Sequence, residues 1–149
     1  MAHKIAMWKA DDGTIFHDET AALRRDEEGR AARAAMQPLG KPFGDRGLSR
    51  KGFIQHRREA VVEAKAALIR ITRPRMADWF AEQEAKNPEL NWLEVDGGYF
   101  CRMLDDGGPI SRAWGRLMCI DSKHREWEQM YFALHPEEGE QVCVGLGHE

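Results

Sequence analysis

The chain has few cysteines and no long apolar run, and both absences narrow the possibilities. Its 149 residues include three cysteines, Cys101, Cys119 and Cys143, which are widely spaced and odd in number. This pattern predicts free thiols in a reducing compartment, so we expect no disulfide. No apolar stretch approaches the roughly 20 residues of a membrane-spanning helix, and none follows the charged start. We therefore expect a cytoplasmic protein without a membrane partner.

Signatures of catalysis and cofactor binding are also missing. No Gly-x-Ser-x-Gly nucleophile motif occurs, and the glycine-rich basic stretch 40–51 lacks the Gly-Lys-Ser/Thr ending of a P-loop. Cys119 with His124, and Cys143 with His148, are the nearest approaches to zinc-ligand spacing, but neither is a standard pair. We predict no catalytic residue, no metal and no cofactor. A small enzyme whose site is assembled from scattered side chains stays an alternative.

The composition is that of an ordinary soluble protein. Hydrophobic residues make up 42% of the chain and charged residues 32%, and the length suits one domain with a real core. Proline and glycine interrupt regular structure at 37–48. We therefore expect a single domain over 1–149, in which this connector separates an N-terminal hairpin and helix from the main body.

The first regular structure is predicted at 8–16. Two short apolar runs flank Asp12-Gly13, a dipeptide that tolerates the positive φ angles of a tight hairpin turn. Asp18 or Thr20 can then cap a helix that runs from about Glu19 to Met36. The apolar residues of this helix are mostly alanines, so it should form easily and bury little.

This opening, Trp8-Lys9-Ala10-Asp11-Asp12-Gly13-Thr14-Ile15-Phe16 and the helix after it, resembles the start of many small accessory proteins of phages and mobile elements. Those openings commonly combine an aromatic residue, Ala, Asp-Gly and Phe with a capped helix. The resemblance covers about the first 27 residues and transfers no catalytic residue. It implies a role in host manipulation or in replication support.

Further helices are predicted in the middle of the chain. Ser49 can cap a long helix whose stripe includes Ile54, Val61 and Leu68, and Pro74 should end it. A shorter helix follows Pro74 and stops at 87–88. Later apolar residues, between 109 and 134, predict either one long helix or two helices broken near Asp121.

A second hairpin and a last strand are predicted as well. Residues 92–104 contain two apolar runs around Asp96-Gly97-Gly98, and residues 141–146 form a final apolar run. Two hairpins, a terminal strand and four or five helices, without regular alternation, predict an α+β fold. Its sheet should be mainly antiparallel, with helices on one face.

The charges are unevenly distributed along the chain. Residues 24–75 hold 14 Lys and Arg against 6 Asp and Glu, a net charge of +8, whereas the remainder holds 8 against 19, a net charge of −11. Such asymmetry indicates either electrostatic choice of a partner or segments that neutralise each other in the fold. The candidate binding residues share this basic segment; they are Arg46, Arg50, Lys51, Arg57, Arg58, Arg73 and Arg75.

These observations favour a non-enzymatic binding protein, encoded by a phage or mobile element, that acts by protein–protein contact on a host complex. Inhibitors of bacterial defence systems, anti-CRISPR proteins included, are of this kind. The alternative binding function is a nucleic-acid accessory factor whose arginines at 46–75 follow a phosphate backbone. The sequence leaves the oligomeric state and the partner's identity open.

Overall fold

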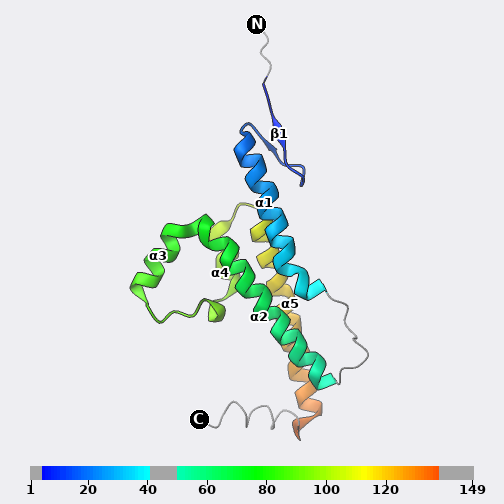
Figure 1. Cartoon of the computed structure of the whole chain (residues 1–149). Helices are drawn as coiled ribbons and strands as arrows, with labels where there is room; N and C mark the ends of the chain where they lie inside the picture. Colours follow the sequence, from blue (N-terminus) through cyan, green and yellow to red (C-terminus); the bar gives the residue numbers. More distant parts are fainter. Residues whose placement is uncertain (1–4, 41–49, 138–149) are drawn as a thin grey trace.

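The structure, a computed structural model, describes residues 5–40 and 50–137. A short hairpin opens it, and helices make up most of the rest (Figure 1). The strands are β1 (Trp8–Lys9) and β2 (Ile15–Phe16), and the long helices are α1 (Glu19–Met36), α2 (Arg50–Thr72) and α5 (Pro109–Leu134). The shorter helical elements are α3 (Ala77–Lys86), α4 (Gly97–Leu104) and the 3-10 turns η1 (Gln37–Gly40), η2 (Arg73–Met76) and η3 (Trp92–Glu94).

The predicted fold class is wrong. The described residues form a mainly helical protein, whose two-stranded sheet consists of β1 and β2, rather than an α+β fold with a mainly antiparallel sheet. The strand predicted at 141–146 lies outside the described residues. The error that can be located is therefore the second hairpin, at 92–104, which is helical.

The first hairpin and the helix after it are confirmed. Trp8 pairs with Phe16 and Lys9 with Ile15 in an antiparallel register, and both aromatic residues are partly buried. Gly13 supplies the turn with a φ of +90°, which glycine adopts without strain. Asp18 caps α1 by accepting the N–H of Thr20 at 3.1 Å, and α1 then spans the predicted Glu19–Met36.

The second predicted hairpin fails because Asp96 caps a helix instead of turning a strand. Its carboxylate accepts the N–H of Gly98 at 3.0 Å, and α4 begins at Gly97. Gly97 is needed where α4 crosses α5, since a Cβ there would lie 2.8 Å from the buried ring of Trp114. Asp105, with a φ of +32°, then ends α4 in the left-handed region.

The last predicted helix is one continuous element. Pro109 occupies the first turn of α5, and the helix passes Asp121 without a break. Asp121 instead pairs with Arg125 one turn further on, at 3.3 Å. This single helix of 26 residues extends along α1 and α2 and therefore organises the molecule.

Helices α1, α2 and α5 pack on one another, and α3, η3 and α4 form a lobe beside them (Figure 1). The predicted long helix is confirmed as α2, which buries Ile54, Val61 and Leu68 and ends just before Pro74. The largest fully buried side chains belong to α2, α3, α4 and α5; they are Trp114, Phe80, Phe100, Ile54, Leu68, Ile110, Leu117 and Thr72.

Candidate functional site

A cavity of about 290 Å³ lies where the hairpin meets α1 and α5. It brings together residues that are more than eighty positions apart in the sequence. Acidic side chains come from the hairpin turn and α1, and guanidinium groups come from α1 and α5. The lining residues are Asp11, Asp12, Arg25, Asp26, Gly29, Ala32, Arg33, Met36, Pro109, Arg112, Ala113 and Arg116.

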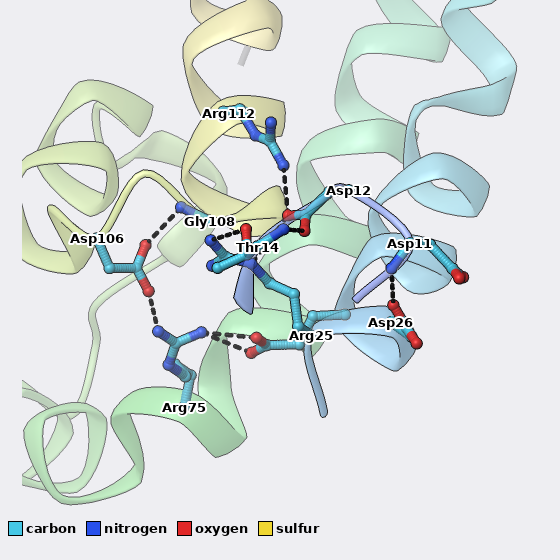
Figure 2. A network of polar contacts seen from close by, with 10 residues as sticks. Asp11, Asp12, Thr14, Arg25, Asp26, Arg75, Asp106, Gly108 and Arg112 are labelled. Atoms are coloured by element: carbon cyan, nitrogen blue, oxygen red, sulfur yellow. Dashed lines mark hydrogen bonds and ion pairs between the residues drawn. The ribbon is translucent and has the colours of Figure 1, made fainter. Parts of the chain in front are cut away.

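Asp12 is the centre of the polar network beside this cavity (Figure 2). Its Oδ1 accepts the backbone N–H of Thr14 at 3.0 Å, which closes the hairpin turn. Its Oδ2 accepts Arg25 Nε at 2.9 Å and Arg112 Nη2 at 3.2 Å. One carboxylate thus joins the hairpin turn to α1 and to α5.

The pKa of Asp12 is lowered from its ordinary value. Hydrogen bonds from the backbone and side chain of Thr14 are the main cause, and the charge of Arg25 adds to them. Partial burial opposes the shift but does not outweigh it. Asp12 is therefore ionised at neutral pH with its oxygens engaged, so it anchors the turn rather than acting as a general base.

A second contact holds the other side of the turn to α1. The backbone N–H of Asp11 donates to Oδ1 of Asp26 at 2.7 Å. Arg25, one residue earlier in α1, also donates through Nη2 to the hydroxyl of Thr14 at 3.2 Å. The hairpin is consequently fixed to α1 at both ends of its turn.

Arg75 forms a neighbouring clamp that joins η2 to α1 and to the loop between α4 and α5 (Figure 2). Its Nη1 donates to both carboxylate oxygens of Glu28 in α1, at 2.8 and 2.7 Å. Its Nη2 pairs with Asp106 in the loop between α4 and α5. Asp106 also accepts the N–H of Gly108 at 3.0 Å, so the clamp reaches the residue before α5.

The basic residues proposed from the sequence are distributed over separate contacts. Arg57 donates to the carbonyl oxygen of Leu39 at 3.1 Å, and Arg58 pairs with Glu128 of α5. Arg73 pairs with Glu84 of α3 and lies 4.8 Å from the ring centroid of Phe80. Together with the Arg75 clamp, these contacts commit much of the basic segment to internal acidic or carbonyl partners.

The other three candidate binding residues, Arg46, Arg50 and Lys51, lie at the start of α2 or before it in the sequence. Lys51 lies half-buried in the first turn of α2 and takes part in contacts there. The backbone of Arg50 begins α2, whereas Arg46 lies outside the described residues. The structure therefore does not gather the seven predicted residues into one described surface.

A smaller cavity, of about 210 Å³, lies between α2 and the middle of α5. Phe53 and Trp127 form its aromatic wall, with ring centroids 5.2 Å apart. The adjacent His124 is buried, and its Nε2 lies 3.4 Å from Glu128 without a hydrogen bond. Burial, followed by the charges of nearby arginines, lowers the pKa of His124, so the imidazole is neutral at pH 7.

The residues that build the cavity between the hairpin, α1 and α5 could not be identified from the sequence. Asp12 and Arg112 are 100 positions apart, and no local pattern connects them. One signal was present, however, because Arg112 and Arg116 place two like charges one turn apart near the start of a helix. Positive charges near a helix N-terminus are disfavoured by the helix dipole, and two of them one turn apart also repel each other. The N-terminal half of α5 is unusual in having both features.

Within the described residues there is neither a cluster of metal-ligating side chains nor a helix suited to span a membrane. No group of three His, Cys, Asp or Glu side chains comes together as metal ligands would in residues 5–40 and 50–137. None of the helices described there combines the length and the apolar character that a membrane span requires. Comparison with known proteins found no matching family model, no similar curated protein and no similar solved structure.

Proposed function

We propose that the protein is a non-enzymatic binding protein that docks on another protein through the outer face of its N-terminal hairpin. The observation that carries the proposal is the exposure of Ile5, Met7 and Ile15, which are 70%, 58% and 57% exposed. Large apolar side chains left in water at neighbouring positions are typical of interaction sites. We define these three residues as the hairpin patch.

The strand geometry places Ile15 of the hairpin patch on the side opposite to Trp8. Side chains alternate along a strand, so Lys9 lies on the face of β1 opposite to that of Trp8, and we expect Met7, the residue before β1, on the Lys9 side. Ile15 is the cross-strand partner of Lys9 and belongs to the same face. Trp8 and Phe16 face the other way and are partly buried, and Arg25 lies 5.8 Å from the Phe16 ring centroid.

The expected partner contributes an extended strand with apolar side chains. In the described part of the chain, β1 pairs with β2 alone, so the outer edge of β1 offers unpaired backbone groups beside Met7. Strand addition uses such an edge for backbone hydrogen bonds and uses alternate side chains for specificity. The Asp12 network fixes the hairpin in advance, which lowers the entropic cost of binding.

The partner we propose is a protein of a bacterial host complex, such as a defence system. The support is the resemblance of the opening to accessory proteins of phages and mobile elements. The residues that carry the resemblance form the hairpin and α1, and the hairpin bears the exposed patch. We expect a strand of the host protein to pair with the outer edge of β1. The host protein could then no longer use that strand within its own complex, and the complex would be inhibited.

Site-directed cross-linking tests this proposal. A photo-reactive amino acid placed at Ile15 should capture a discrete bacterial protein, whereas the same group at Val62, an exposed apolar residue of α2, should not. The change Met7→Glu should reduce capture from position 15, since it puts a charge into an apolar contact. Equal capture from both positions, or capture that is unaffected by Met7→Glu, would contradict docking through the hairpin patch.

Nucleic-acid binding stays the second candidate, supported by a groove between α1 and α2. This groove, of about 620 Å³, is lined by three arginines and two glutamates: Arg24, Arg70, Arg75, Glu27 and Glu28. Arg75 pairs with Glu28, whereas Arg24 and Arg70 have no ion pair among the described residues. Arg24→Gln with Arg70→Gln should weaken DNA retention and reduce its salt dependence by about one to two charges, if nucleic acid is bound. The double variant Arg24→Gln with Arg70→Gln should leave cross-linking from position 15 unchanged, because neither arginine belongs to the hairpin patch.

A further inference from the structure

We propose that the cavity between the hairpin, α1 and α5 binds a small monocarboxylate with an apolar body, a ligand independent of the protein partner proposed above. The cavity has an apolar floor, because Ala32, Met36 and Ala113 line it and are themselves buried. Three exposed residues, Arg33, Arg112 and Arg116, also line the cavity and supply its guanidinium groups. An apolar surface with a few convergent polar groups is the usual form of a small-molecule site.

The positions of the arginines follow from how α1 meets α5. Gly29 is buried where α1 passes Pro109, and a Cβ at residue 29 would lie 3.6 Å from Nη1 of Arg33 and 3.8 Å from Pro109. The Arg33 guanidinium therefore folds back over Gly29 towards the start of α5. Arg112 and Arg116 extend from α5 one turn apart and line the same cavity.

These arginines differ in what they already contact. Arg112 is held by Asp12, at 3.2 Å. Arg33 and Arg116 have no acceptor among the residues that the structure describes, although both line a cavity that also contains acidic side chains. Arg112 is in the first turn of α5, near the positive end of its dipole, and it repels Arg116 one turn further on. An anion bound in the cavity that these two residues share with Arg33 would relieve this repulsion.

The acidic side chains limit the charge of the ligand. Asp11, Asp12 and Asp26 line the cavity against Arg25, Arg33, Arg112 and Arg116, which gives the lining a net charge of +1. One carboxylate neutralises that charge, whereas a phosphate dianion would exceed it and face Asp11 and Asp26. Guanidinium groups suit the planar carboxylate because they can donate to both of its oxygens. The cavity is therefore expected to prefer a monoanion to a dianion.

Hexanoate is a suitable probe, with hexan-1-ol and hexyl phosphate as its neutral and dianionic counterparts. Titration followed by backbone amide NMR should show saturable shifts at Gly29 and Ala113 with hexanoate. Hexyl phosphate and hexan-1-ol should each bind more weakly, by about tenfold, since each lacks the matching charge. Equal binding of the alcohol would show an apolar cavity without anion recognition and would overturn the proposal, as would tighter binding of the phosphate.

Variants locate the anion contact. Arg33→Gln with Arg116→Gln should weaken hexanoate binding by about tenfold or more. Arg30→Gln is the matched control, because Arg30 is an exposed residue of the same helix that does not line the cavity. If the double variant folds poorly by circular dichroism, Arg116→Gln alone serves in its place. Unchanged binding in the folded variant, or an equal loss in the control, would refute the site, and neither result bears on the hairpin patch.

Discussion

Two regions of this molecule are held together by different forces. The lobe formed by α3, η3 and α4 attaches to α5 through stacked aromatic rings, with Phe100 between Phe80 and Trp114. The hairpin attaches to α1 and α5 through the Asp12 network and buries little apolar area. Aromatic burial is insensitive to salt and large in free energy, whereas partly exposed charge contacts are weaker and screened. We therefore expect the lobe to unfold with the core and the hairpin to open locally.

Loss of an aromatic ring should have the largest effect. Phe100 is fully buried, and its ring centroid lies 4.9 Å from that of Trp114 and 5.7 Å from that of Phe80. Phe100→Ala should reduce the free energy of unfolding by about 3–5 kcal/mol, because it leaves a cavity between two rings. Chemical denaturation measures this change. A loss below about 1 kcal/mol would show that the stack does not hold the lobe.

An added methyl group at the α4–α5 crossing should have the next largest effect. The Cβ of Gly97→Ala would meet the sulfur of Met118 and lie 2.8 Å from the Trp114 ring, which is fully buried and has little room to move. We expect a loss of about 1–3 kcal/mol in the free energy of unfolding. Gly98→Ala is the neighbouring control, since its Cβ meets side chains at 3.4 Å.

Removal of the network's central carboxylate should release the hairpin alone. Asp12→Ala deletes the acceptor for Thr14, Arg25 and Arg112, and we expect the hairpin to open more readily by about 1–2 kcal/mol. Amide hydrogen exchange should speed up in the hairpin, while the amides of α4 keep their protection. Added salt should produce the same pattern in the unaltered protein. A parallel loss of protection in α4 would show that the two regions unfold together.

The buried imidazole of His124 adds a pH dependence to the α2–α5 contact. Burial first, then the charges of Arg57 and Arg58, lower the pKa of His124 below 6.5, and Asp121 opposes them. The folded state therefore favours the neutral ring, so stability is fully present above pH 6.5 and is lost as the pH falls through the folded pKa. Because one proton is bound, His124 should contribute no more than about 1.4 kcal/mol per pH unit to the dependence of the unfolding free energy on pH.

Substitution separates this contribution from other acid-labile contacts. His124→Gln should flatten the fall in unfolding free energy as the pH decreases below 6.5. His56→Gln, which changes an exposed histidine of α2, should leave the fall unchanged. An equal slope in His124→Gln and the unaltered protein would assign the pH dependence to other groups.

The smallest expected effect is a gain in stability, at Gly29. Gly29 lies inside α1 with helical backbone, and a Cβ there would make ordinary contacts at 3.6 Å with Arg33 and 3.8 Å with Pro109. Gly29→Ala should therefore stabilise the protein by about 0.5–1 kcal/mol, through helix propensity. Thermal unfolding compares this variant with Gly97→Ala. A loss at residue 29 would show that the α1–α5 crossing is as tightly packed as the α4–α5 crossing.

Three Asp-Gly pairs explain how far the fold could be predicted from the sequence. Asp12, Asp96 and Asp106 each accept the N–H of the residue two positions later, at 3.0 Å. The first closes a hairpin, whereas the other two lead into α4 and α5. The local signal is the same in all three places, and it indicates a turn without deciding whether a strand or a helix comes next. Packing against Trp114 decides for a helix at Gly97, and that contact is not visible in the sequence.

Helix-forming patterns were the more reliable guide. The bounds of α1 and the course of α2 were predictable, because a cap, a periodic stripe and a following proline act over a few residues. The arginines of the basic segment were visible, but not their partners, since Arg58 meets Glu128 and Arg75 meets both Glu28 and Asp106. Charge counts identify such residues without showing whether the fold neutralises them.

The contact between Arg112 and Asp12 has a consequence for the order of folding. It joins residues 100 positions apart, so the loop that it closes is among the longest the chain can form. Contacts of such separation carry a high entropic cost and form late. During synthesis the hairpin is made before α5 and cannot gain this contact until α5 exists. The hairpin, although translated well before α5, should therefore complete its attachment only after α5 has formed.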